Sequence, residues 1–530
     1  MKKINLSIFI LVFSFLSCEK PLDLVPYDFP LPENYYSNKT EMNYALTGIY
    51  SVLKDHALYA NNMLGRMGLD ADQAFNRNSN DANSIGDYSV STADIKVQSF
   101  WRVLYAGINR ANMLLKNIDV PTDLTDAERD VIEGEALFLR SYFYFLLVTN
   151  FGDVPLILEP INTASAAAHQ ATRTSKVQVY QQIVSDLEKA ADKVLSIETL
   201  GYGGRVNQSA VWGILARVNL HWAGFPIKDE TRYAEARKWA KKVMDHPVHK
   251  LNPSFQNVFE KLARDEYEIG ESIFEVEFYG NGTGIYASLG GYVGVNNGIY
   301  NQTDLNIGFG YSYINTTRYT YDIYESASDK RRDWTVAPFY YAFTNGVGRE
   351  VNRTANQIMH RNCGKFRRTS ETLLPKHRSL TPQNFPVLRY SDVLLMFAEA
   401  DNYVNNGATA EGYEALNKVR RRGYGLDVNL ASPSVDIAEG LTEEEFLEII
   451  QDERTRELAF ECLRKGDLVR WGIFLTRMKD RLTEVNNHEY FYDLRFARAT
   501  FTNVSARDVV WPIPSYELGV NYELEQNVGW

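Results

Sequence analysis

The spacing of apolar residues predicts a mostly helical protein. Between residues 38 and 250, apolar positions recur every three or four residues, as in the run that starts at Trp101. Thr125 with Glu128, and Ser175 with Gln178, have the spacing of capping boxes that begin helices. Successive helices joined by short loops favour helix pairs stacked as a solenoid, similar to tetratricopeptide arrays but without a strict sequence repeat.

Residues 251–390 follow a different pattern. The run SIFEVEF (272–278) alternates like a β-strand, and a long segment rich in Gly, Asn and Tyr follows it. Helical periodicity returns over residues 391–530, which we expect to pack on the same body. There, one helix is predicted from the capping box at Thr442 to about residue 472, and the spacing of its charges favours ion pairs with neighbouring helices over catalysis.

The first residues have the features of an export signal. Residues 1–17 combine two lysines with an apolar stretch too short to span a bilayer, and Cys18 follows a small residue. This arrangement resembles a bacterial lipoprotein signal, in which the cysteine is acylated after cleavage; the alternative is an ordinary thiol. Residues 18–37 contain four prolines and are predicted to be an extended tether.

Composition and charge exclude several functions. The chain has 530 residues and a net charge of −11, without a long Lys/Arg run, which argues against nucleic acid as a partner. The apolar run 136–148 contains Arg140 and is interpreted as a buried helix. Besides Cys18 only Cys363 and Cys462 are present, and we expect two buried thiols, with a disulfide as the alternative.

The sequence contains no recognisable catalytic motif. The nucleophile elbow, the phosphate-binding loop, the dinucleotide fingerprint and paired cysteines are all absent. His488-Glu489 begins a zinc-protease pattern that Tyr492 breaks, and a weak calcium-loop pattern at residues 76–87 has Asp81 in place of the turn glycine. We therefore predict no catalytic residue, cofactor or metal. A glycoside hydrolase stays an alternative, because its two catalytic carboxylates could come from any pair of the many acidic residues.

The most informative segment is rich in tyrosine and lacks cations. Residues 272–317 contain no Lys, Arg or His, and residues 279–345 contain 11 tyrosines, 9 glycines and 7 asparagines. Aromatic plates with hydroxyl groups, amide side chains and glycine loops suit a neutral, hydroxyl-rich ligand such as a glycan; packing on the scaffold is the alternative. The candidate ligand-binding residues here are Tyr286, Tyr292, Asn296, Tyr300, Tyr311 and Tyr313.

A second candidate patch is the polar loop at residues 67–89. Asp72 and Arg77 are candidates for hydrogen bonds to ligand hydroxyls, and Tyr88 for stacking on a sugar ring. A surface ion pair is the alternative for Asp72 and Arg77.

Several long motifs in a fixed order carry a family resemblance. They are WRVLYAGINRAN (101–112), GEALFLRSYFYFLLVTNFGDVPL (134–156), PVLRYSDVLLMFAEADN (386–402), ALNKVRRRG (415–423), ERTRELAFECLRKGDLVRWG (453–472) and VVWPIPSYELGVNYELEQNVGW (509–530). With the signal at Cys18, the chain resembles the SusD/RagB outer-membrane nutrient-binding lipoproteins over nearly its whole length.

The resemblance implies four tetratricopeptide-like helix pairs with a loop-rich region that holds the ligand site. It also implies a lipid anchor on Cys18, display on the cell surface, and a SusC-like TonB-dependent transporter as partner. Non-catalytic binding of oligosaccharides is the implied function. A peptide-binding lipoprotein of the same fold is the alternative, and a surface glycoside hydrolase is the third hypothesis.

Overall fold

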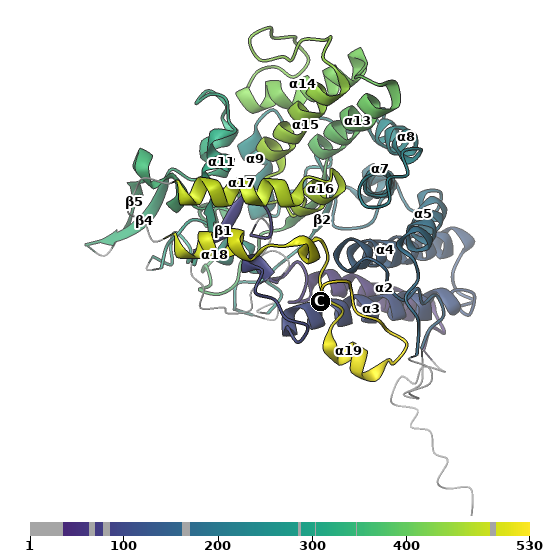
Figure 1. Cartoon of the computed structure of the whole chain (residues 1–530). Helices are drawn as coiled ribbons and strands as arrows, with labels where there is room; N and C mark the ends of the chain where they lie inside the picture. The colour runs from purple at the N-terminus through teal and green to yellow at the C-terminus, as the bar shows by residue number, and fades with distance from the viewer. Residues whose placement is uncertain are drawn as a thin grey trace, which may run out of the picture.

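A row of long helices forms the scaffold (Figure 1). The computed structural model describes residues 35–62, 69–77, 85–161, 170–284, 288–302, 304–345, 347–487 and 494–530. The row consists of α2 (Lys39–Tyr50), α3 (Ile95–Lys116), α4 (Asp126–Phe151), α5 (Lys176–Ala191), α7 (Gln208–Ala223), α8 (Arg232–Met244), α13 (Tyr390–Asn405), α14 (Ala410–Tyr424) and α15 (Glu443–Leu458). Each helix contacts the next one in this order. The predicted mostly helical fold with tetratricopeptide-like pairs is confirmed.

The helices begin where the capping residues predict. The Thr125 side chain accepts the Glu128 backbone N–H in a full capping box at the start of α4, and the Ser175 side chain accepts the Gln178 backbone N–H at the start of α5. Helix α4 is buried along most of its length, which explains its apolar sequence. Within it, Arg140 pairs with Asp186 of α5 at 2.7 Å and donates to Asn112 of α3, so one buried cation joins three helices.

No helix in the described ranges is both long enough and apolar enough to cross a membrane.

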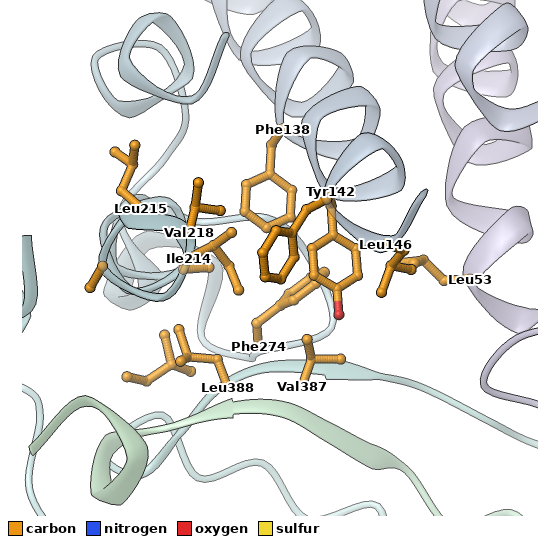
Figure 2. Packing of buried hydrophobic residues seen from close by; sticks show 14 of the residues in the cluster. Leu53, Phe138, Tyr142, Leu146, Ile214, Leu215, Val218, Phe274, Val387 and Leu388 are labelled. Atoms are coloured by element: carbon orange, nitrogen blue, oxygen red, sulfur yellow. The ribbon is translucent and has the colours of Figure 1, made fainter. Parts of the chain in front are cut away.

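The loop-rich region is an insertion between α8 and α13, which contact each other directly. Its two ends meet in a two-stranded antiparallel sheet of β2 (Ser272–Val276) and β6 (Phe385–Arg389), which confirms the strand predicted at this position. Figure 2 shows the sheet residues Phe274, Val387 and Leu388 packed against side chains of α4 and α7. The insertion therefore leaves and rejoins the scaffold at one buried position.

Short elements lie between the long helices, both before α8 and within the insertion. They are η1 (Ser51–Lys54), β1 (Ala74–Asn76), η3 (Ile85–Asp87), α6 (Ile197–Leu200), α9 (Phe255–Arg264), α10 (Val293–Asn296), β3 (Ile314–Thr316), α11 (Arg318–Asp322), α12 (Arg331–Thr335), β4 (Phe339–Thr344), β5 (Val347–Asn352), η5 (Ala355–His360) and η6 (Arg368–Ser370). Strands β4 and β5 form a hairpin that projects from the body (Figure 1).

The helix predicted from Thr442 to residue 472 is two helices. Helix α15 ends at Leu458, and α16 (Arg464–Arg470) begins after a turn in which Phe460 and Cys462 have φ of 64° and 80°. Left-handed conformations at two non-glycine residues end a helix, and periodicity alone does not reveal them. Both cysteines are free thiols, and Cys363 is fully buried.

The charges of α15 and α16 form ion pairs with other elements, as predicted. Glu457 contacts Arg331, Arg389 and Arg422 at 2.5–3.2 Å, all in the protein interior. These contacts hold the pKa of Glu457 well below its ordinary value, because the three guanidiniums outweigh the effect of burial, which alone would raise it. The network joins the scaffold to the inserted region.

The C-terminal elements cross the front of the molecule (Figure 1). They are α17 (Phe474–Asn486), α18 (Arg495–Asn503), η7 (Ala506–Val509) and α19 (Ser515–Val520). Trp511 and Trp530 are partly buried against the main core, so the tail lies on the helical body as expected.

Candidate functional site

A short strand pair brings the two predicted ligand-binding patches together. Strand β1 pairs antiparallel with β3, with Asn76 opposite Ile314, and the Arg77 N–H donates to the Tyr313 carbonyl at 2.8 Å. Residues more than two hundred positions apart thus become neighbours. Arg77 reaches the tyrosine segment because of this pairing.

Tyr311 and Tyr313 form a parallel pair of rings beside Arg77. Their ring centroids are 5.4 Å apart, their planes differ by 2°, and both residues are half-buried. Between them, Ser312 is fully buried with φ of 55°, and its hydroxyl donates to the Gly298 carbonyl at 2.8 Å. A left-handed serine is strained, and strain of this kind is held at binding sites by surrounding structure. The strained turn places both rings side by side.

Arg77 connects this pair with two further tyrosines. Its guanidinium lies 4.2 Å from the centroid of the Tyr300 ring and donates to the Tyr311 carbonyl at 3.3 Å. Tyr300 lies 6.4 Å from Tyr340 of the projecting hairpin, and Arg353 covers the Tyr340 ring at 4.1 Å. We call Tyr300, Tyr311, Tyr313 and Tyr340 the tyrosine platform; all four are half-buried.

A second guanidinium lies near the ring pair through its contact with Phe309. Phe309 packs edge-on against Tyr311 with centroids 4.7 Å apart, and Arg378 lies 4.9 Å from the Phe309 ring. Arg378 is exposed. The platform is therefore bordered by cations that come from outside the tyrosine-rich segment.

Two more of the predicted residues belong to α10 and its N-terminal cap, which support the platform from below the surface, since Asn296 itself is buried. Asn296, at the end of α10, accepts the Tyr313 N–H through its carbonyl at 2.9 Å, and its side-chain amide donates to Asn61. The Tyr292 N–H donates to the Ala60 carbonyl at 2.9 Å, and the Tyr292 ring is half-buried. Loop 55–62 of the N-terminal region thus supports the same surface.

Asp72 and Tyr88 do not belong to this surface. Asp72 has no exposed area and forms a two-point ion pair with Arg464 of α16, with N–O distances of 2.8 and 2.7 Å. Tyr88 is 4% exposed and donates its hydroxyl to the Asp70 carbonyl at 2.6 Å. Both side chains contact the protein interior, Asp72 through its ion pair with Arg464 of α16 and Tyr88 through its ring contact with Phe474 of α17.

Two predicted residues cannot be placed. Tyr286 and Cys18 lie outside the described residues.

Sequence reasoning missed Phe309, Tyr340, Arg353 and Arg378. Tyr340 was within the tyrosine-rich stretch, so composition pointed to it without singling it out. The available signal for the arginines was the cation-rich run at residues 345–380, downstream of the cation-free segment.

A cavity of about 530 Å³ lies elsewhere, between the helical scaffold and the C-terminal region. Tyr142, His221 and Lys465 are among its lining residues, and the platform tyrosines are not. The sequence-predicted residues that the fold brings together lie at the platform and not in this cavity, so we assign the candidate site to the platform. In the described part of the chain, no three His, Cys, Asp or Glu side chains gather as metal ligands.

Comparison with known proteins places the chain in a family. Residues 271–530 match the model of the SusD family, and residues 22–220 match a model described as starch-binding associating with outer membrane. The chain belongs to the SusD family. A SusD-like protein of Formosa agariphila is 26% identical over 98% of this chain and 97% of its own length.

Solved SusD structures share the whole fold. A SusD homolog from Bacteroides thetaiotaomicron has a TM-score of 0.85 and 27% identity, covering 94% of this chain and 98% of its own. A surface glycan-binding protein A from Bacteroides uniformis has a TM-score of 0.68 and 27% identity, covering 92% of this chain and 99% of its own.

Proposed function

We propose that this SusD-family protein binds oligosaccharide or polysaccharide at the tyrosine platform without cleaving it. The observation that carries the proposal is the half-buried group of Tyr300, Tyr311, Tyr313 and Tyr340, held by a strained turn and an arginine from a distant loop. Aromatic rings of this kind pack on the C–H faces of sugars while their hydroxyls and nearby amides meet sugar hydroxyls. The description of relatives as glycan-binding supports it.

The proposal extends to cellular location and partner. The protein is anchored in the outer membrane through lipid on Cys18, faces the cell surface, and delivers its ligand to a SusC-like TonB-dependent transporter. The family description as associating with outer membrane supports this location. Co-purification of a barrel protein with the wild-type chain from outer membranes, and loss of membrane retention in Cys18→Ala, would test anchor and partner.

Binding is tested with the soluble form that begins at Glu19. Native affinity gels with a panel of polysaccharides measure retardation, and the same mixtures are assayed for released sugar. We expect retardation by at least one glycan without sugar release. Release that disappears on substitution of one Asp or Glu would instead make the protein a hydrolase.

The residue assignment is tested with Tyr311→Ala and Tyr313→Ala. Each removes one ring of the parallel pair, and we expect about tenfold weaker binding, equivalent to about 1.4 kcal/mol. Tyr44→Ala is the matched control, because Tyr44 is a 65% exposed tyrosine on α2. Unchanged glycan affinity in both platform variants would show that the ligand binds at another site.

A further inference from the structure

The charges around the platform oppose the net charge of the protein. Residues 345–380 contain eight Lys or Arg and two Asp or Glu, within a chain whose net charge is −11. This run follows the cation-free tyrosine segment and folds back against it, because Phe339–Thr344 and Val347–Asn352 form the hairpin that carries Tyr340.

Some of these cations serve the protein interior. Lys365 pairs with Glu461 at 2.6 Å, and Arg368 pairs with Glu371 at 2.7 Å, with all four side chains buried. Their charges are neutralised by specific partners, so they are not available to a ligand.

Arg77 and Arg378 differ from them. Arg77 donates to the Tyr311 carbonyl and lies over Tyr300; Arg378 is exposed and lies over Phe309. Neither forms an ion pair with a residue that the structure describes. Both contacts keep a guanidinium near the platform, and no carboxylate among the described residues neutralises it.

Asp304, an acidic residue of the tyrosine segment, forms no ion pair with either arginine and is bonded elsewhere. Asp304 accepts the backbone N–H groups of Gly348 and Asn306 at 2.9 Å. These backbone hydrogen bonds lower the pKa of Asp304 and keep its carboxylate directed at the hairpin and its own turn.

A planar guanidinium presents paired N–H donors that match the oxygens of a carboxylate or a sulfate. The remainder of this acidic protein repels polyanions, so anions are attracted only where such cations gather. A glycan that stacks on Tyr311 and Tyr313 would place its ring substituents near Arg77, which donates to the Tyr311 carbonyl, and near Arg378, which lies over the neighbouring Phe309.

We propose that the platform selects acidic glycans, with Arg77 and Arg378 binding carboxylate or sulfate groups on sugars that stack on the tyrosines. The inference rests on the proposed function and refines it, since the cation-free segment considered alone suggested a neutral ligand. The fold brings two positive charges to this segment from other parts of the chain, Arg77 and Arg378.

The test compares glycans that share a backbone and differ in charge. The pairs are polygalacturonate against its methyl ester, for carboxylates, and dextran sulfate against dextran, for sulfates, with laminarin as an unrelated neutral glycan. Affinity gels and calorimetry use the soluble form of the full folded chain at low and high salt. We expect tighter binding of the acidic member in at least one pair, weakened severalfold by high salt because screening reduces charge attraction.

Arginine variants identify the residues responsible. Arg77→Gln and Arg378→Gln should each weaken binding of the acidic glycan about fivefold and leave binding of its neutral counterpart nearly unchanged. Arg102→Gln is the matched control, because the exposed Arg102 also lies over a tyrosine, Tyr516, at 5.5 Å on the helical part of the protein. We expect it to bind like the wild type.

The outcomes separate the two proposals. Neutral glycans bound at Tyr311 and Tyr313 with equal affinity for both members of each pair would overturn the acidic preference and leave glycan binding intact. An acidic preference that Arg77→Gln and Arg378→Gln both retain would also overturn it. Absence of binding to every glycan would overturn the proposed function itself.

Discussion

Replacing Asp72 should destabilise the protein rather than remove a ligand contact. Asp72 and Arg464 are both buried and joined by two hydrogen bonds at 2.8 and 2.7 Å. Asp72→Asn keeps the shape but leaves the guanidinium buried without its counter-charge, which costs about 3–5 kcal/mol. For a folded chain of this length, an unfolding entropy of about 1 kcal/mol/K converts this loss into a Tm lowered by about 3–5 °C.

The assay is scanning calorimetry of the soluble form at neutral pH. Asp480→Asn, on the exposed side of α17, is the matched control and should change the free energy of unfolding by less than about 0.5 kcal/mol. A double-mutant cycle with Asp72→Ala and Arg464→Met should give a coupling energy of about 2 kcal/mol or more. Glycan affinity that falls in Asp72→Asn while the Tm stays at the wild-type value would refute this reasoning and restore Asp72 as a ligand contact.

Three further predictions concern the site and the core. Ser312→Val should lower the free energy of unfolding by about 1–3 kcal/mol and weaken glycan binding, because a β-branched residue is strained at φ of 55°. Ser312→Gly should keep glycan binding, and calorimetry and affinity gels measure the two effects. Burial raises the pKa of Glu275 from 4.5 to about 7. The folded protein therefore favours the protonated carboxyl, and the contribution of this group to the free energy of unfolding is fully present below about pH 4.5 and is lost as the pH rises through 7. Glu275→Gln should therefore be about 3 kcal/mol more stable than the wild type at pH 8 and nearly equal to it at pH 4.5, and equal stability at pH 8 would count against this. Tyr88→Phe should lose about 1 kcal/mol with its hydrogen bond to the Asp70 carbonyl, and unchanged glycan affinity would agree with its buried position.

Local sequence patterns predicted the helices well. Capping residues such as Thr125 and Thr442 act on the backbone a few positions away, so their effect is encoded nearby in the sequence. The break after Leu458 was missed because it depends on left-handed Phe460 and Cys462, which the surrounding packing imposes.

The candidate site was only half predictable. Composition identified the tyrosine segment, including Tyr300, Tyr311 and Tyr313, because a locally enriched residue type is visible in one stretch. The arrangement of its charges was not visible, since Arg77 reaches the site through the β1–β3 pairing and Arg378 through the return of the chain after the hairpin. Long-range pairing of this kind has no local signature.

The contact between α8 and α13 has an evolutionary consequence. Because α8 and α13 contact each other directly, and β2 and β6 pair near the two ends of the insertion, the exposed loops between these strands can change in length or composition while α8 and α13 stay packed, provided that buried partners of the scaffold such as Arg331 and Lys365 are kept. Recombination that exchanges this segment at the β2 and β6 boundaries would transplant ligand preference between relatives in one step. Arg77, which lies outside the exchanged segment, would have to be inherited or selected separately.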